Sequence, residues 1–172
     1  MSEDDVTTRV VRRADPADEG SVGSDSAADR SVGGTYTLII DLPEATTVDV
    51  GALGEHRFPA GGYAYTGSAL GTGGFSRVDR HARIARGEHD VRHWHVDYLL
   101  GTPESRIAEV VRSDGVDVEC SVAERLPKGP LDGFGSSDCG CRSHLSRDDD
   151  VASLSERVTR AHDAVASSRN DR

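Results

Sequence analysis

Hydrophobic and β-branched residues alternate with polar ones in short runs, and these runs set the expected fold. The run from Thr35 to Ile40 is β-branched and aromatic and ends before Pro43, which predicts a strand. Shorter runs at 46–50 and 61–67 end at or lie between glycines, and they predict two more strands. We expect the three strands to form a small antiparallel sheet.

Helical patterns follow the third strand. Apolar residues recur at helical spacing over 75–86, which predicts an amphipathic helix. Shorter helices are expected at 94–100 and 118–126, and a further strand at 106–111. The predicted fold class is therefore α+β, a small central antiparallel three-stranded sheet flanked by helices.

Both ends of the chain have a different composition from its middle. Residues 1–33 contain few large apolar groups, so they are expected to form a disordered acidic tail. One domain is expected over 34–145, in which 128–145 forms an ordered loop. Residues 146–172 are expected to be a charged C-terminal tail with a weak helix over 150–166.

The charge of the chain is strongly acidic. The 172 residues include 30 Asp and Glu against 20 Lys and Arg, a net charge of -10, and the only lysine is Lys128. Such a surface is typical of proteins that stay soluble in concentrated salt, so we expect a halophilic source. The N-terminus lacks the features of a signal peptide and no stretch is apolar enough to span a membrane, so a cytoplasmic location without membrane contact is expected.

Two triplets on the first and third predicted strands carry a resemblance to a known family. Gly34-Thr35-Tyr36 and Tyr65-Thr66-Gly67 resemble the paired motifs of the GIY-YIG nuclease superfamily. The stretch 34–145 also resembles a small prokaryotic subgroup of that superfamily. Its shared segments here are Tyr65-Thr66-Gly67-Ser68-Ala69-Leu70, Arg80-His81, His93-Trp94-His95-Val96-Asp97-Tyr98, Glu119-Cys120 and Gly133-Phe134-Gly135-Ser136-Ser137-Asp138-Cys139-x-Cys141.

The resemblance implies a metal-dependent endonuclease that hydrolyses phosphodiester bonds, with DNA as the expected substrate. Tyr36 is cast as the base, a role that needs a nearby cation to favour the phenolate. Arg77 would clamp the scissile phosphate, and Tyr65 and His81 would position the phosphate or the attacking water. Glu119 would bind one Mg²⁺ or Mn²⁺.

Three features depart from the superfamily pattern. Thr35 stands where isoleucine is preferred in the first triplet. The triplets lie farther apart than is usual, so 42–60 would be an insertion in the connecting hairpin. Ser68 stands where DNA-repair relatives carry a lysine, which removes one phosphate contact of those relatives.

The predicted helix 75–86 carries a row of arginines. Residues 77–95 contain five Arg against three acids, a local excess of positive charge in an acidic protein. Such a stripe suits phosphate binding, although a row of this kind also occurs as a solvated helix face. The expected nucleic-acid contacts are Ser68, Arg80, Arg83 and Arg86.

Three cysteines and one histidine form a second candidate site. Cys120 precedes the pattern Cys139-x-Cys141-x-x-His144, a set of four ligands that suits a tetrahedral structural zinc ion. The spacing is tighter than that of a standard zinc ribbon, so buried thiols beside a Ser136-Ser137-Asp138 turn are the alternative.

Each residue of the nuclease set also has a purely structural interpretation. A strand tyrosine commonly packs in the core, and Glu119 would be favoured by the dipole of its own helix. Asp97 lies one helical turn from His93 if this segment is helical, so it could orient His93 in a proton relay, but a structural hydrogen-bonded pair is the favoured interpretation. The alternative function is thus a catalytically silent module that binds nucleic acid or protein. In either case a domain of this size leaves little room for base readout, so a partner protein or the shape of the substrate would supply specificity.

Overall fold

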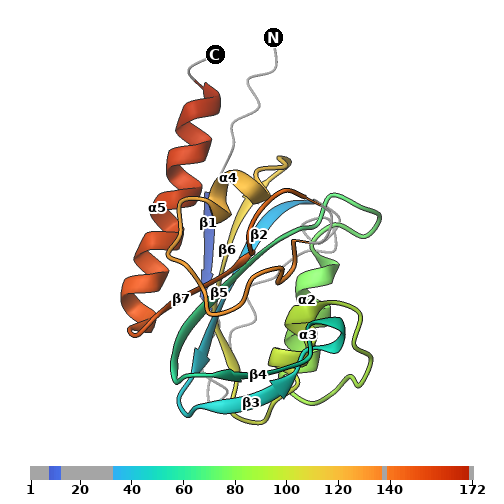
Figure 1. Cartoon of the computed structure of the whole chain (residues 1–172). Helices are drawn as coiled ribbons and strands as arrows, with labels where there is room; N and C mark the ends of the chain where they lie inside the picture. The colour runs from blue at the N-terminus through green and yellow to red at the C-terminus, as the bar shows by residue number, and fades with distance from the viewer. Residues whose placement is uncertain (1–7, 13–32, 137–138, 171–172) are drawn as a thin grey trace.

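A computed structural model of the chain describes residues 8–12, 33–136 and 139–170. Its α+β fold places an antiparallel sheet between helices (Figure 1). The strands are β1 (Thr8–Arg12), β2 (Gly34–Leu42), β3 (Thr46–Asp49), β4 (Glu55–Phe58), β5 (Gly61–Ser68), β6 (Arg106–Asp114) and β7 (Leu145–Asp148). The helices are the 3-10 turn η1 (Gly51–Leu53), α2 (Ser76–Ala85), α3 (His95–Leu100), α4 (Glu119–Ala123) and α5 (Val151–Asn170).

The central sheet has five strands in the order β1-β6-β2-β5-β7, and neighbouring strands are antiparallel. The strands predicted at 35–40, 61–67 and 106–111 form its centre as β2, β5 and β6. The expected sheet of three strands at 35–40, 46–50 and 61–67 was wrong, because β6 lies beside β2, and β1 and β7 extend the sheet at its two edges. The strand predicted at 46–50 is β3, which pairs with β4 in a separate two-stranded sheet within the expected insertion 42–60.

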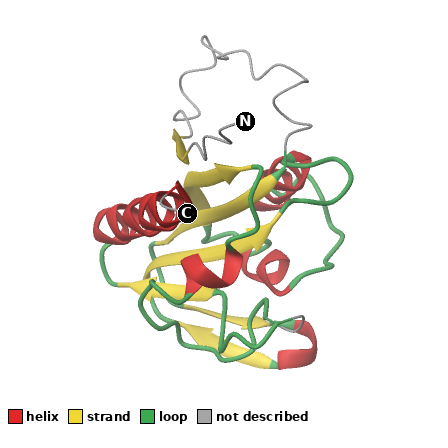
Figure 2. Ribbon diagram, turned by 90° about the horizontal axis from the view of Figure 1, so that it is seen from above, coloured by secondary structure: helices red, strands yellow, loops and turns green. Residues whose placement is uncertain are grey.

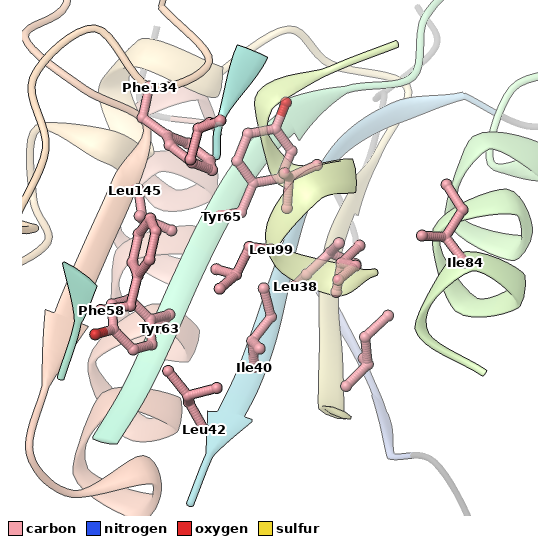
Figure 3. Packing of buried hydrophobic residues seen from close by; sticks show 14 of the residues in the cluster. Leu38, Ile40, Leu42, Phe58, Tyr63, Tyr65, Ile84, Leu99, Phe134 and Leu145 are labelled. Atoms are coloured by element: carbon pink, nitrogen blue, oxygen red, sulfur yellow. The ribbon is translucent and has the colours of Figure 1, made fainter. Parts of the chain in front are cut away.

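The residues of β2 alternate between the two faces of the sheet. Leu38 joins a large apolar cluster with Ile84 of α2 and Leu99 of α3, and Figure 3 shows the side chains of this cluster on the face of the sheet that these helices cover. Ile39 points to the other face, where it packs with Val158 of α5. Because side chains alternate along a strand, β2 separates two cores and is buried on both sides.

Helix α5 covers one face of the sheet, as Figures 1 and 2 show. It has 20 residues and continues beyond the weak helix expected at 150–166. Its buried apolar residues recur at intervals of four and three positions, as one helix face requires: Leu154, Val158, Ala161 and Val165. The expectation of a charged tail over 146–172 therefore fails for β7 and α5, because α5 gains stability by burying this face.

The N-terminal segment contributes one edge strand. Residues 8–12 form β1 and pair with β6, whereas disorder was expected throughout 1–33. Edge pairing rests on backbone hydrogen bonds, and a segment of only five residues is too short for its hydrophobic pattern to reveal this pairing. The rest of that expectation, over 1–7 and 13–32, lies outside the described residues.

The shorter helices lie beside the strand ends. Helix α2 falls within the predicted 75–86, α3 within 94–100, and α4 occupies only the first part of 118–126. Helices α2 and α3 contact each other, and α4 contacts α5 and β5. In the part of the chain that the structure describes, none of the helices combines the length and the apolar character needed to cross a bilayer.

Candidate functional site

The pairing of β2 with β5 brings the two motif tyrosines together. Tyr36 lies opposite Gly67 and Tyr65 lies opposite Leu38, and the two aromatic rings are 6.3 Å apart between centroids. A Cβ atom on Gly67 would come within 2.7 Å of the Tyr36 hydroxyl oxygen. Glycine at this position therefore makes room for the phenol of Tyr36. This steric requirement explains the glycine of the second triplet.

Both phenols are buried rather than placed in an open cleft. Tyr36 is 1% exposed and Tyr65 is 6% exposed. Burial raises the pKa of Tyr36 well above its usual value and raises the pKa of Tyr65, while Arg77 lowers both by a smaller amount. Desolvation therefore outweighs the effect of Arg77, and Tyr36 is a neutral phenol.

Helix α2 supplies His81 as the hydrogen-bonding partner of Tyr36. The Tyr36 hydroxyl oxygen is 2.8 Å from His81 Nε2, and His81 Nδ1 is 3.2 Å from Asp97 Oδ1. The buried His81 ring lies 6.3 Å from the ring of Tyr65. Desolvation lowers the pKa of His81 despite the opposing effect of Asp97, so the imidazole is neutral near pH 7.

Asp97, in the first turn of α3, anchors this network. Its carboxylate is 0% exposed and accepts hydrogen bonds from Arg80 and from the backbone N–H groups of His93 and Trp94. Desolvation would raise the pKa of Asp97, but its hydrogen bonds, the largest from His81, lower it to about 2.

The charge of Asp97 fixes the tautomer of His81. An ionised carboxylate only accepts hydrogen bonds, so the proton of the neutral imidazole lies on Nδ1. His81 Nε2 is then the acceptor and the Tyr36 hydroxyl is the donor. The result is a directed chain from Tyr36 through His81 to Asp97.

The side-chain partner expected for Asp97, His93, was wrong. Asp97 binds the backbone N–H of His93, and its side-chain partners are His81 and Arg80. One sequence signal pointed to burial: Asp97 is the sole carboxylate in the apolar α3 segment between Val96 and Leu100. Its partners, 16 and 17 positions earlier in the chain, have no periodic relation to it.

The arginines of α2 separate into two groups. Arg77, Arg80 and Arg83 line a cavity of about 300 Å³ together with Trp94 and the glycine-rich turn before α2. The guanidinium groups of Arg77 and Arg80 each lie 4.7 Å from the Trp94 ring centroid. Arg86 is not among the lining residues and instead binds Glu88.

Ser68 and Arg80 were both expected to contact phosphates, and the structure shows a different environment for each. The backbone carbonyl of Ser68 accepts a hydrogen bond of 2.6 Å from Arg77 Nη1, so Ser68 holds the arginine in place. Arg80 Nη1 is buried and has no hydrogen-bond partner among the described residues. An unpaired cationic donor beside a cavity suits an anionic ligand.

The three cysteines and His144 converge in space. One ligand atom from each of Cys120, Cys139, Cys141 and His144 can be chosen so that all lie within 4.8 Å of one another. His144 Nε2 is 3.3 Å from Cys139 Sγ and 3.8 Å from Cys120 Sγ. A tetrahedral zinc ion would separate sulfur and nitrogen ligands by about 3.6 Å. The cluster is therefore able to hold a metal ion of this kind.

The thiols influence one another strongly. The hydrogen bond with Cys141 is the largest of the effects that raise the pKa of Cys120. Burial opposes ionisation of Cys139, but its contacts with both other cysteines and with His144 lower its pKa overall. Only a bound cation would allow all three thiols to ionise at so short a range.

Glu119 lies beside this cluster. Its Oε1 atom is 2.8 Å from His144 Nδ1, and its side chain is 21% exposed. Burial would lower the pKa of His144, but Glu119 reverses this and raises it. The carboxylate charge also raises the pKa of Tyr36 and Tyr65.

The expectation of a hard-cation site gains no geometric support. Within the described ranges, the sole grouping of three or more metal-ligating side chains is the cysteine cluster with His144. Glu119 is accordingly the neighbour of a ligand in that cluster. The structure thus supports a soft metal site and not a magnesium or manganese site.

Comparison with known proteins gives the family of the chain. Searches among curated proteins and among solved structures found no match. A family model described as "Domain of unknown function DUF123" matches residues 35–167, which include β2 through most of α5. Because the match spans both tyrosines, the arginine helix and the cysteine cluster, the chain belongs to the DUF123 family.

Proposed function

We propose that this protein is an endonuclease of the GIY-YIG type that hydrolyses phosphodiester bonds, with DNA as its expected substrate. The observation that carries the proposal is the buried chain Tyr36–His81–Asp97. A buried ionised carboxylate beside a histidine of lowered pKa is costly to maintain, and such perturbed groups concentrate at functional sites.

The chain accounts for how a water molecule would be activated. As water attacks phosphorus, its proton passes to the Tyr36 oxygen and the phenolic proton passes to His81 Nε2. Asp97 then stabilises the imidazolium. The leaving oxygen takes a proton from solvent water as its bond to phosphorus breaks, and the imidazolium returns its proton to solvent, which restores neutral His81. His81 thereby supplies the basicity that a neutral phenol lacks.

The arginine-lined cavity supplies the binding part of the proposal. Arg77, Arg80 and Arg83 would contact phosphates, and the planar guanidinium fork suits two oxygens at once. Arg77 has one N–H directed to the Ser68 carbonyl, which orients the rest of its fork. Positive charge gathered at one cavity of an acidic protein favours a polyanion such as nucleic acid.

The proposal includes two metals, a structural zinc ion and a catalytic hard ion. Zinc is the metal proposed for the cysteine cluster, because thiolate and imidazole ligands at tetrahedral spacing suit it, and a site closed by four protein ligands is structural. A hard ion such as Mg²⁺ or Mn²⁺ remains part of the nuclease proposal as a requirement to be tested. It would neutralise charge on the phosphate oxygens when bound.

A second candidate is a catalytically silent module that binds nucleic acid. The burial of Tyr36 and Tyr65 favours it, because substrate water needs access to the phenol. The two candidates share the arginine cavity and differ in whether the tyrosine network reacts. A cleavage assay with a matched pair of variants therefore separates them.

The test compares Tyr36→Phe with Thr37→Val, neighbouring residues on β2 that each remove one hydroxyl bonded to a buried histidine. Purified proteins are incubated with branched and single-stranded DNA in high salt, with Mg²⁺, Mn²⁺ or chelator. We expect Tyr36→Phe to lower the cleavage rate by about 100-fold or more, since it removes the proton path. Thr37→Val should cleave at nearly the wild-type rate.

Both variants should still bind DNA, because neither alters the arginine cavity. Cleavage that is equal in the two variants would reject the proposed role of the network. Absence of cleavage by the wild type with every metal, together with retained DNA binding, would establish the silent module instead.

A further inference from the structure

We propose that Glu119 is the carboxylate that orients His144 at the metal centre, and that it acts as a positioning residue and not as a ligand of a hard cation. This inference rests on the metal proposed for the cysteine cluster, and it is independent of nuclease activity. It assigns to Glu119 a task different from the one implied by the GIY-YIG resemblance.

The two nitrogens of His144 face different partners. Nε2 faces the sulfur atoms of Cys139 and Cys120 at 3.3 and 3.8 Å. Nδ1 is 2.8 Å from Glu119 Oε1, although its N–H is not well aligned with that oxygen, and no other described residue bonds to it. The ring is fully buried, so water does not replace the carboxylate. Nε2 is thus the metal-binding atom, and Nδ1 carries the proton directed at Glu119.

A carboxylate in this position has a defined effect on the metal. It selects the tautomer in which Nε2 is free to coordinate, holds the ring in the orientation needed, and makes the imidazole a stronger donor. Glu119 and Cys120 are consecutive residues of α4, so one short helix supplies both a ligand and the residue that orients another ligand. The arrangement resists the loss of His144 from the cluster.

The metal centre is also joined to the tyrosine strand. The carbonyl oxygen of His144 accepts a hydrogen bond of 3.1 Å from the backbone N–H of Thr66, next to Tyr65. The backbone N–H of His144 donates to Phe134, whose ring lies 6.1 Å from that of Tyr65. Ordering His144 therefore orders the backbone that carries Tyr65.

The test measures metal affinity in full-length wild-type protein and in two charge-matched variants. Glu119→Gln keeps the size of the side chain and removes its charge. Glu124→Gln removes a charge that is exposed at the C-terminal cap of α4 and that also acts on Cys141. Zn²⁺ affinity is obtained by competition with a chelator, and Co²⁺ reports the ligand set through its thiolate absorption bands.

We expect one Zn²⁺ per chain in the wild type and a loss of affinity of about 10- to 100-fold in Glu119→Gln, the range typical of partners that orient metal-bound histidines. Glu124→Gln should change the affinity less than threefold, which is about 0.65 kcal/mol by the affinity relation. The metal-free forms of both variants should unfold at the same temperature, so that the loss reflects metal binding and not folding.

Histidine ring nitrogen signals in the Zn²⁺-loaded protein give a second measurement. We expect Nε2 of His144 to be metal-bound and Nδ1 to be protonated. Equal affinities in Glu119→Gln and Glu124→Gln, or metal bound at Nδ1, would overturn the inference while leaving the zinc site intact. A wild type that binds no Zn²⁺ would overturn the zinc site and this inference together, and neither result bears on DNA cleavage.

Discussion

Two adjacent residues of β2 each bond a buried histidine, on opposite faces of the same sheet. The Tyr36 hydroxyl binds His81 at 2.8 Å on the face covered by α2 and α3. The Thr37 hydroxyl binds His162 of α5 at 2.8 Å, and the other ring nitrogen of His162 lies 2.8 Å from the Ser113 hydroxyl. Both imidazoles are therefore satisfied by two hydrogen bonds.

The two networks differ in charge and in what lies beyond them. His162 has hydroxyl partners only, and burial alone lowers its pKa to about 4. His81 has an ionised carboxylate behind it, and that carboxylate binds an arginine at the wall of a cavity. A neutral network suffices to pack a helix on a sheet, whereas a charged one beside a cavity is what substrate chemistry needs.

The largest expected effect is at the charged network. Asp97→Ala should lower the free energy of unfolding by about 3–5 kcal/mol, because it leaves Arg80 unpaired and removes the partner of His81. The control is Asp132→Ala, which breaks an exposed ion pair with Arg142 and should leave the free energy of unfolding nearly unchanged. Chemical denaturation measures both, and similar values would show that the buried network is not special.

An effect of intermediate size is expected at the neutral network as pH falls. The pKa of His162 is about 4 in the folded state against 6.5 in the unfolded state, so the unfolded chain binds more protons between these values. The stabilisation is complete above pH 6.5 and is lost as pH falls toward 4, by about 3 kcal/mol in total.

The variant His162→Gln isolates this contribution. It keeps hydrogen-bonding atoms but does not titrate, so unfolding free energies measured from pH 7 to pH 4 should fall less steeply than in the wild type. The lowered pKa of His81 acts in the same direction in both proteins and cancels in the comparison. Parallel profiles would contradict the assignment to His162.

The smallest expected effect is at the cavity rim. Arg83→Gln should weaken DNA binding about equally for different sequences and lower the salt dependence by about one phosphate contact. Arg160→Gln removes an exposed arginine from α5, on the opposite face, and should bind like the wild type. Binding measured against salt concentration compares the two slopes, and equal slopes would remove the cavity from the binding surface.

Local patterns were sufficient for the central elements of the fold. The strands at β2, β5 and β6 and the helix α2 follow from alternation or helical spacing in their own residues. The strand β3 was also recognised, but its placement in the main sheet was wrong, because its partner is the polar strand β4. Pairing depends on a second segment, and a pattern within one strand does not name it.

In the candidate site, too, some residues were recognisable from the sequence, whereas their partners were not. The triplets, Arg77 and His81 are recognisable as motifs, and strand register explains why Tyr36 and Tyr65 meet. Asp97 was assigned to the wrong partner, because the distance along the chain says nothing about which side chains meet in a buried network. Glu119 was expected to face a hard cation, whereas its Oε1 atom lies 2.8 Å from Nδ1 of His144.

Residue order alone determined which segments are strands and helices, where the cysteines recur and where positive charge gathers, because these depend on neighbours within a few positions. Tertiary structure decided that α5 closes the second face of the sheet, that the phenols are buried, and which carboxylate serves which histidine. These outcomes arise from contacts between distant segments, where burial changes the energy of a charge far more than its sequence neighbours do.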